Sequence, residues 1–419
     1  AGSRVALPAS LDRHTVAALH GIWLVGAEAV PLHETWTGAE RARALDLLRP
    51  GMVLSKADVE SGSTLEGGSE WGLAGRRALS GPPWGSRPLT HLLTSGTSGN
   101  PRVVTLTVGN LLASAEASRE RLGLEPSDRW LGSLSPAHVG GLALLTRGAL
   151  LGSAVVLRGS FRTPTFLELV RTGQVTHASL VPTMLHRLLA SWGEERIPST
   201  LRCLLVGGAP TDPELLRRAL EAGFPVALTY GLTEAASQVA TAPPELVKKK
   251  PGTVGPPLPG VEVELAPDGE ILVRGPAMAP DGELLVRGPT VAPGQVEEHG
   301  WLHTGDLARR DGDGHLWITG RLSDRIISGG VSVDPGEVEA VLGAHPDVLE
   351  VAVVGIPDPE WGERVAAAVV AGPGASGLWE ALQEEAGARL SPAKRPRVLR
   401  EMEALPRNRN GKVDRGRLR

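Results

Sequence analysis

The sequence contains little cysteine, no marked excess of one charge and no long apolar run. One cysteine, Cys203, occurs among 419 residues, which excludes an internal disulfide and a cysteine-based metal site and fits a reducing compartment. Because Cys203 lies in an apolar, strand-like run, we interpret it as a core residue rather than a nucleophile. The 43 basic and 47 acidic residues leave a net charge of −4, without the footprint of a nucleic-acid-binding or membrane-surface protein. Any anionic ligand must therefore be bound by a few local groups.

No stretch is apolar over enough residues to be expected to cross a bilayer. The most apolar region, residues 140–157, is interrupted by Arg147 and followed by Arg158, whereas a span needs about 20 apolar residues. The first residues lack the pattern of a secretion signal. We therefore expect a cytoplasmic protein without membrane insertion. A homo-oligomer is compatible with the sequence and is not decided by it.

Short β-rich runs bounded by glycine alternate with amphipathic stretches, the pattern of an α/β protein with largely parallel sheets. The predicted strands include residues 154–157, 177–180, 201–206 and 226–229. A helix is predicted over residues 213–222, capped by Thr211 or Asp212 and stopped by Gly223. At this length, two or more domains are expected.

Beyond Pro256 the sequence changes to β-hairpins, with Asp-Gly turn signals that begin at Asp268, Asp281 and Asp311. The segment DGEILVRGP at residues 268–276 recurs as DGELLVRGP at residues 281–289. Two copies are too few for a solenoid. We interpret them as a duplicated hairpin arm, for which a surface insertion without a role is the simpler alternative. The last hundred residues return to mixed α/β character.

Four segments combine residues suited to chemistry. In the first, HLLTSGTSGNPR, a strand leads into glycines and hydroxyl residues whose N–H and O–H groups can surround an anion. The segment lacks the Gly-Lys-Ser/Thr ending of a P-loop. Taken alone, an ordinary turn explains it as well as a phosphate-binding loop does.

The second segment, TYGLTEAAS at residues 229–237, follows an apolar strand and predicts the start of a helix. Tyr230, the only tyrosine of the chain, can stack on a base, and Thr233 can donate to a phosphate near a helix start. Glu234 offers oxygen ligands suited to Mg²⁺. A helix cap by Thr233, with the acid favouring the helix N-terminus, is the alternative.

The third and fourth segments lie nearer the C-terminus. After a Thr-Gly turn, Asp306 can accept two ribose hydroxyls, and Arg321 can donate to ribose or phosphate. Lys412 follows a glycine in the basic segment RNRNGKVDR. Separately, a structural acid and a solvated basic tail are the simpler interpretations.

Together and in this order, these segments resemble the acyl-adenylating superfamily of acyl-CoA synthetases, nonribosomal-peptide adenylation domains and luciferases. The resemblance extends from SRVALPAS near the beginning to RNRNGKVDR near the end. It implies a large N-terminal domain at residues 1–320, with mixed and parallel sheets, helices and a β-rich subdomain. It also implies a hinge at residues 321–323 and a small, mobile α+β C-terminal domain at residues 324–419.

The resemblance assigns roles to particular residues. ATP phosphates would contact the first loop, at Thr94, Ser95, Gly96, Thr97, Ser98, Gly99 and Arg102. Adenine would stack on Tyr230 beside Gly231, and Asp306 would bind ribose, with Arg321 nearby. Thr233 and Glu234 would handle the α-phosphate and Mg²⁺, with Glu234 as the metal ligand. Lys412 would bridge the substrate carboxylate and the α-phosphate, and Gly329 and Gly330 would line the tunnel for coenzyme A.

The chain also departs from the family pattern. Asn100 and Arg102 stand where relatives often carry lysines in the phosphate loop, and Arg102 retains a charge with a planar donor fork. At the hinge, Ser323 stands where many relatives carry Asp or Lys. Because a hinge needs only to absorb backbone rotation, we still expect the motion.

A narrower resemblance, in residues 137–152, 176–191, 204–210 and 229–239, is to the 2-succinylbenzoate:CoA ligases of menaquinone biosynthesis. It places His138 at the carboxylate or CoA entrance, although a histidine beside a glycine turn is also often structural. The acyl pocket would be lined by Ser179, Thr183, Gly208 and Ala209, whose small side chains leave space for an aromatic ring. The group that binds the succinyl carboxylate is not identified by the sequence.

We therefore predict an ATP- and Mg²⁺-dependent acid:CoA ligase that acts on 2-succinylbenzoate through an acyl-adenylate. Another aryl- or acyl-CoA ligase, or an enzyme that loads a carrier protein, is the alternative within the same class. A nucleotide-binding relative without catalysis is the alternative of a different class. Retention of Glu234, Asp306 and Lys412 argues against it.

Overall fold

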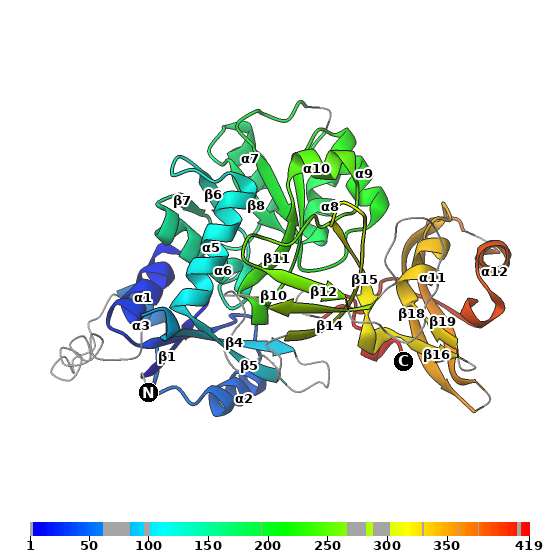
Figure 1. Cartoon of the computed structure of the whole chain (residues 1–419), viewed down its shortest axis with the longest axis horizontal. Coiled ribbons are helices and arrows are strands. Elements are labelled where there is room, and N and C mark those ends of the chain that lie inside the picture. Colours follow the sequence, from blue (N-terminus) through cyan, green and yellow to red (C-terminus); the bar gives the residue numbers. More distant parts are fainter. Residues whose placement is uncertain are drawn as a thin grey trace.

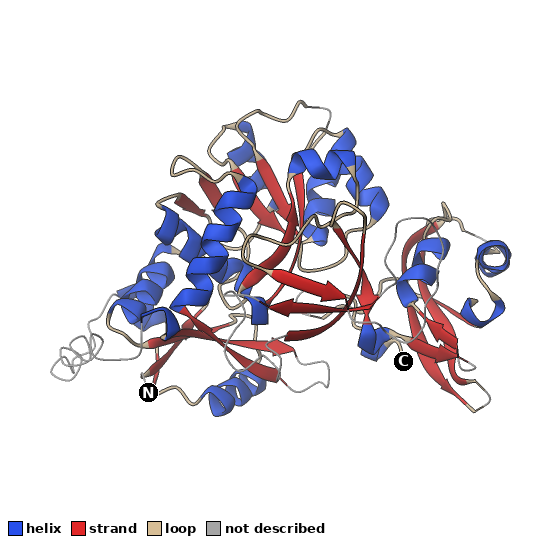
Figure 2. Cartoon of the chain, viewed as in Figure 1, coloured by secondary structure: helices blue, strands red, loops and turns tan. Residues whose placement is uncertain are grey.

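The computed structural model describes residues 3–61, 84–95, 101–193, 195–265, 282–287, 302–328, 331–359, 361–375, 377–408 and 412–419. Figure 1 shows a large body and, to one side of it, a smaller one that contains the elements from β16 to α12. Both bodies contain helices and strands (Figure 2). The fold is α/β in the large body, with a β-rich part, and α+β in the small one, as the sequence predicted.

The first sheet has the strand order β3-β1-β2-β4-β5. Its strands are β1 (Arg4–Pro8), β2 (Glu28–Leu32), β3 (Met52–Val53), β4 (Pro88–Ser95) and β5 (Pro101–Thr107). The helical segments along this part of the chain are α1 (Arg13–Leu24), α2 (Gly38–Leu48), α3 (Lys56–Ser61) and η1 (Trp84–Ser86). All neighbours are parallel except β4 and β5, which form an antiparallel hairpin.

The second sheet has the order β11-β10-β9-β8-β6-β7. Its strands are β6 (Arg129–Gly132), β7 (Ala154–Leu157), β8 (His177–Leu180), β9 (Cys203–Val206), β10 (Val226–Leu232) and β11 (Ser237–Ala242). It is parallel except for the β10–β11 pair. The strands predicted in this region are thus confirmed, with two boundaries shifted.

Helices cover both faces of the second sheet. They are α5 (Val108–Leu122), α6 (Val139–Leu151), α7 (Thr163–Arg171), α8 (Pro182–Ser191), α9 (Pro213–Glu221) and α10 (Pro244–Lys249). Helices α7 to α10 pack in one buried cluster with β8 to β10. Helices α5 and α6 lie between the two sheets, because Leu111 and Leu145 pack against the first sheet while Leu144 packs against the second. The predicted helix is confirmed as α9, and Asp212 caps it by accepting a hydrogen bond from the Leu215 amide.

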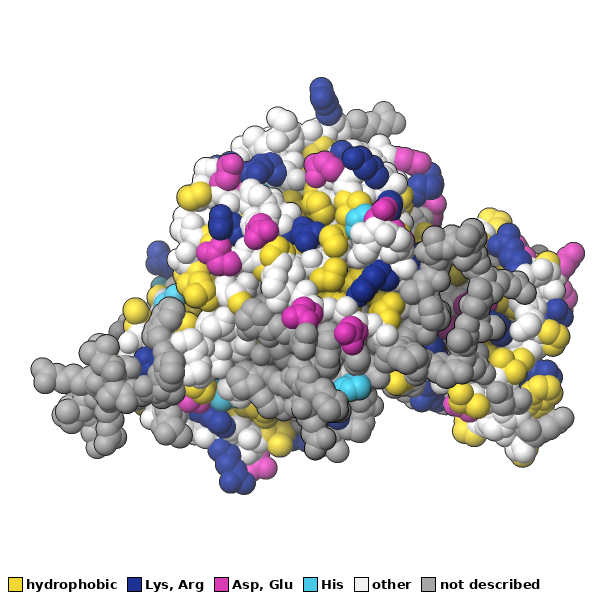
Figure 3. Space-filling model, viewed as in Figure 1, with side chains coloured by type: hydrophobic (Ala, Val, Ile, Leu, Met, Phe, Trp, Pro, Cys, Tyr) yellow, Lys and Arg dark blue, Asp and Glu magenta, His cyan; other side chains and the backbone are white. Residues whose placement is uncertain are grey.

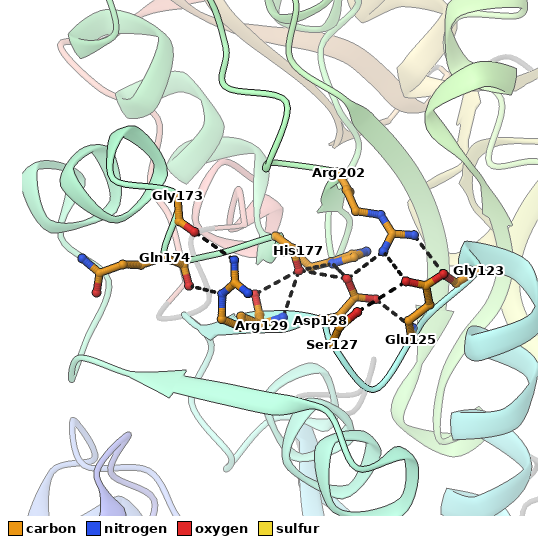
Figure 4. A network of polar contacts seen from close by, with 10 residues as sticks. Gly123, Glu125, Ser127, Asp128, Arg129, Gly173, Gln174, His177 and Arg202 are labelled. Atoms are coloured by element: carbon orange, nitrogen blue, oxygen red, sulfur yellow. Dashed lines mark hydrogen bonds and ion pairs between the residues drawn. The ribbon is translucent and has the colours of Figure 1, made fainter.

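A polar network closes the amino edge of the second sheet (Figure 4). Asp128 precedes β6, and its side chain is 3% exposed. It pairs with Arg202 at 2.9 Å and accepts a hydrogen bond from Thr176 at 3.1 Å. Thr176 in turn bonds to the Nδ1 atom of His177. Because every charge here has a partner within the network, we interpret it as structural.

The third sheet is antiparallel and has the order β12-β13-β14-β15. Its strands are β12 (Glu262–Leu265), β13 (Gly282–Arg287), β14 (Leu302–Arg310) and β15 (Leu316–Arg321). The second copy of the repeat supplies β13, an inner strand, so this copy is not a surface insertion. The first copy, residues 268–276, lies outside the described residues.

The chain leaves the third sheet at Arg321 and enters a fourth at Ile326, through η3 (Leu322–Asp324). The fourth sheet contains β16 (Ile326–Ser328), β17 (Val331–Val333), β18 (Val348–Asp358), β19 (Gly362–Ala371) and β20 (Val398–Glu401). Beside it are α11 (Pro335–Leu342), α12 (Leu378–Arg389), η4 (Pro392–Lys394) and η5 (Arg415–Arg417). The hinge proposed at residues 321–323 coincides with this change of sheet.

Cys203 lies in β9 and is 3% exposed. Burial raises the pKa of its thiol to about 12, so it is protonated at neutral pH and acts as a core residue. In the part of the chain that the structure describes, no helix combines the length and apolar character needed to cross a membrane. On the face drawn in Figure 3, basic and acidic side chains are interspersed among the coloured atoms.

Candidate active site

Three of the predicted nucleotide-binding residues meet where β10 approaches the third sheet. Asp306 on β14 is buried, and its Oδ2 atom accepts a hydrogen bond of 2.7 Å from the Tyr230 hydroxyl. Its Oδ1 atom lies 2.6 Å from Nε of Arg321, which stands opposite Asp306 in the β14–β15 register. Burial, followed by the charge of Asp306, raises the pKa of Tyr230 well above its ordinary value. The phenol therefore remains a donor at neutral pH.

A tight turn joins Tyr230 to the next strand. The sequence predicted that a helix begins here, and this prediction is wrong: Thr233–Ala235 form one 3-10 turn, η2, and β11 follows at once. A Cβ atom on Gly231 would lie 1.7 Å from the Ser237 carbonyl oxygen, so the chain reversal requires glycine there. Thr233 and Glu234 lie in the turn, half-buried, so Thr233 does not cap a long helix and Glu234 does not stabilise the N-terminus of one.

His138 stands at the N-cap of α6, after the carboxyl end of β6. Its ring centroid lies 5.0 Å from that of His33, a residue for which the sequence provided no signal because it belongs to a distant loop. Burial, then the positive charges of His33 and Lys412, lowers the pKa of His138 to about 4. At neutral pH its imidazole is therefore uncharged.

Lys412 comes from the small domain and enters this site. Removal from water, then the charge of Arg321, lowers the pKa of Lys412, while Asp306 opposes the shift. Because Lys412 also acts on His138, its ammonium group lies within electrostatic range of both the Asp306–Arg321 pair and the imidazole. Lys412 as a whole is exposed, so the removal from water concerns the region of its ammonium group and not the whole residue.

The polypeptide around Lys412 is held on both sides. Its amide donates to the Asn408 side chain at 3.1 Å, and the Asn408 amide donates to the Lys412 carbonyl at 2.7 Å. Three residues further on, Arg415 donates to Glu339 at 2.7 Å and to the Val353 carbonyl. These contacts fasten Lys412 to the small domain.

The predicted phosphate loop lies mainly outside the described residues, which applies to Gly96, Thr97, Ser98 and Gly99. The structure shows its two ends: Thr94 pairs with Arg102 in the β4–β5 hairpin. The side chain of Arg102 is exposed and that of Thr94 is half-buried. The phosphate role of this loop stays a prediction.

The predicted acyl-pocket residues follow or end neighbouring strands. Thr183 lies in the first turn of α8, after β8, and Gly208 and Ala209 follow β9. Ser179 is buried within β8, where its hydroxyl accepts a hydrogen bond of 3.1 Å from Trp130. Parallel neighbours end at the same edge of a sheet, so the first three are grouped at the carboxyl edge. For all four the pocket role stays a prediction, as does the CoA role of Gly329 and Gly330, which lie outside the described residues.

One group of side chains among the described residues has metal-ligand character, at the β14–β15 turn. Ligand atoms of Asp311, Asp313 and His315 lie within 4.8 Å of one another. The Lys250 ammonium group lies between them, at 2.6 Å from Asp311 and 2.5 Å from Asp313. Because the lysine already supplies the positive charge, we interpret this cluster as a clamp between α10 and the hairpin. The assignment of Glu234 as a magnesium ligand stays a prediction.

Comparison with known proteins agrees with this geometry. Residues 1–295 match the AMP-binding enzyme family, and residues 337–412 match the AMP-binding enzyme C-terminal domain. A 2–succinylbenzoate–CoA ligase from Bacillus velezensis is 37% identical over 436 residues, covering 100% of this chain and 87% of the relative. An o-succinylbenzoate CoA synthetase from Bacillus subtilis, solved with an acyl-adenylate, superposes with a TM-score of 0.84 at 32% identity. That match covers 100% of this chain and 88% of the other.

The same Bacillus subtilis synthetase, solved with ATP and a magnesium ion, superposes with a TM-score of 0.83 at 32% identity, covering 100% of this chain and 89% of the other. The fold and the grouped site residues define an adenylate-forming enzyme. The chain belongs to the AMP-binding enzyme family, within which it is an AMP-forming acid:CoA ligase.

Proposed function

We propose that the chain joins 2-succinylbenzoate to coenzyme A, at the cost of ATP, by way of an acyl-adenylate. The observation that carries this proposal is that Lys412, from the far end of the chain, lies within electrostatic range of the Asp306–Arg321 pair and of His138. The relatives named above support the choice of acid. We also propose that the protein is located in the cytoplasm.

In the first half-reaction, a carboxylate oxygen of the acid forms a bond to the α-phosphorus of ATP, and the bond to pyrophosphate breaks. This step brings two anions together, so catalysis consists of positioning and charge neutralisation. Lys412 supplies a cation between the two, while Tyr230 and Asp306 hold adenine and ribose. Thr233 donates to the α-phosphate, and Glu234 would hold Mg²⁺, which neutralises phosphate charge.

In the second half-reaction, the thiol of coenzyme A attacks the acyl carbonyl and AMP leaves. Neutral His138 stands where the carboxylate or thiol would enter and can accept or donate a hydrogen bond there. We propose that the small domain turns about residues 321–323 between the two steps. The position of Lys412 in this structure suits the first step.

The second carboxylate of the acid needs its own cation, and two arginine residues at the carboxyl edge of the second sheet are candidates. Arg158, Arg162 and Ser133 line a small surface hollow at the carboxyl ends of β6 and β7. His138 follows the same end of β6. Arg158 and Arg162 are exposed cations on this edge, and we propose that one of them pairs with the succinyl carboxylate.

The test is an acid panel with two assays, pyrophosphate release and thioester formation. We expect turnover with 2-succinylbenzoate to exceed that with benzoate, simple aryl acids and fatty acids. Strong turnover of benzoate or a fatty acid and none of 2-succinylbenzoate would overturn the choice of acid. Transfer to a carrier protein in place of coenzyme A would indicate a loading enzyme. Binding of ATP without pyrophosphate release for any acid would indicate a non-catalytic relative.

A further inference from the structure

Behind the β10–β11 turn lies a buried polar cluster that the proposed mechanism does not use. Gln238, the second residue of β11, is 2% exposed. Its side-chain oxygen accepts hydrogen bonds from the Ser118 hydroxyl on α5 and from Nη2 of Arg147 on α6, the latter at 2.9 Å. Its amide nitrogen donates to the Thr241 hydroxyl at 2.7 Å. Gln238 therefore connects the turn to both central helices.

Arg147 is held in this cluster without a carboxylate. It is 3% exposed, and no carboxylate in the described parts of the chain forms an ion pair with it. Its guanidinium lies 4.9 Å from the centre of the Trp130 ring, and its Nε atom has no hydrogen-bond partner. Burial lowers the pKa of Arg147 to about 10, so it remains charged at neutral pH. Burying a charge without a counterion costs stability, which calls for a role that a neutral side chain would not perform.

The backbone of the β10–β11 turn is strained, so the shape of the turn depends on contacts from neighbouring elements. Ala236 and Ser237 have φ angles of 52° and 108°, in a region that non-glycine residues rarely adopt. The Ser114 hydroxyl on α5 donates to the Ala236 carbonyl at 2.8 Å. Gln238 follows directly and is fixed from the same side by Ser118 and Arg147. Released from these contacts, the turn would relax and displace the residues before it.

We propose that Gln238, held by Arg147, is a positioning residue that keeps Thr233 and Glu234 in the geometry that binds MgATP. The proposal rests on the proposed function, in that it takes the turn to be nucleotide-binding. Helix α6 gives the arrangement a second consequence, since His138 stands at its N-cap and Arg147 lies nine residues further along the same helix. The helix that presents the imidazole also braces the nucleotide turn.

The test is the dissociation constant for MgATP, measured by calorimetry on the full chain. We expect Gln238→Met to weaken MgATP binding about 10- to 100-fold, the usual effect of removing a residue that orients a ligand-binding group. Gln238→Glu keeps an acceptor oxygen and gives Arg147 a carboxylate, so it should stay close to wild type. Ser118→Ala removes one donor, folds more readily than Gln238→Met, and should weaken binding about fivefold, the equivalent of one hydrogen bond.

Thr176→Val is the matched control, because it removes buried hydrogen bonds at the opposite edge of the same sheet (Figure 4). It should lower the melting temperature without changing MgATP affinity. The effect of Gln238→Met should largely disappear in a Glu234→Gln background, because in this proposal Gln238 acts on MgATP through the position of Glu234.

Unchanged MgATP affinity in Gln238→Met and Ser118→Ala, with only a loss of stability like that of Thr176→Val, would overturn the proposal. Equal damage from Gln238→Glu and Gln238→Met would do so too. The readout needs no acid, so it separates the two hypotheses. A wild type that binds MgATP but does not activate 2-succinylbenzoate contradicts the proposed substrate alone.

Discussion

Charged groups are arranged differently at the two edges of the second sheet. At the amino edge, Asp128 is paired with Arg202 and hydrogen-bonded to Thr176 in a closed network. At the carboxyl edge, His138 lies within electrostatic range of Lys412, and its pKa is lowered first by burial and then by the positive charges of His33 and Lys412. A network in which the charged groups are paired contributes to stability. Ionisable groups whose pKa values are perturbed, in contrast, are often found where a ligand binds. This contrast agrees with the general rule that open α/β sheets bind ligands at the carboxyl ends of their strands.

The largest expected effect is at Lys412. Lys412→Ala should lower pyrophosphate release by about 100- to 1000-fold or more, the scale of removing one preorganised electrostatic group. Thioester formation from supplied acyl-adenylate should persist, because the ammonium group serves the first step. Rapid mixing assays of the two half-reactions measure both rates, and an unaffected first half-reaction would contradict the role.

A smaller effect is expected at the buried carboxylate of the site. Asp306→Asn keeps the shape but removes the charge that pairs with Arg321 and accepts the Tyr230 hydroxyl. We expect the KM for ATP to rise about tenfold or more, the cost of weakening a charged hydrogen bond. Tyr230→Phe is the matched variant, because it removes the same hydrogen bond and retains the carboxylate. A KM unchanged in both variants would exclude Asp306 from ATP binding.

At the amino edge, Arg202→Met should change stability and leave catalysis alone. It removes the cation beside buried Asp128, while Thr176 continues to donate to that carboxylate. Arg202 is itself 39% exposed in its side chain, so we expect a loss of about 1–3 kcal/mol in the free energy of unfolding. Urea titration measures this loss. Altered kcat or KM per folded molecule would show that the amino edge is not purely structural.

The smallest expected effect, a pH dependence, separates two histidines with similar pKa values. Burial is the main cause that lowers the pKa of His138 and of His177, each to about 4. Between pH 6.5 and 4 the unfolded chain therefore binds protons that the folded chain does not, so this contribution to stability is present above pH 6.5 and is lost as the pH falls towards 4.

Replacement of either histidine by glutamine should flatten the stability profile between pH 6.5 and 4. His138→Gln should in addition lower turnover at pH 7.5, whereas His177→Gln should not. Thermal unfolding across this range, with turnover at pH 7.5 in parallel, makes the comparison. Equal kinetic effects of the two replacements would remove the distinction between the edges.

Much of the secondary structure could be predicted from local sequence patterns. Helix α9 follows from its cap at Asp212 and its apolar periodicity, and the strands of the second sheet follow from short apolar runs between glycines. The helix predicted after Tyr230 is wrong because the reversal there uses positive φ angles at Ala236 and Ser237, residues that do not signal such a turn. The role of His33 could not be predicted for another reason. Its proximity to His138 is produced by the tertiary fold and not by the spacing of the two residues in the sequence.

The sequence by itself determined the α/β class, the order of the four segments and the residue types that suit an adenylate-forming enzyme, because these depend on local periodicity and chemistry. Only the tertiary structure decided which residues meet. Packing of distant elements brings Lys412 within electrostatic range of Asp306, and it brings Arg147 to Gln238 across 91 positions. The strained β10–β11 turn likewise exists because α5 and α6 brace it, and no local preference encodes that support.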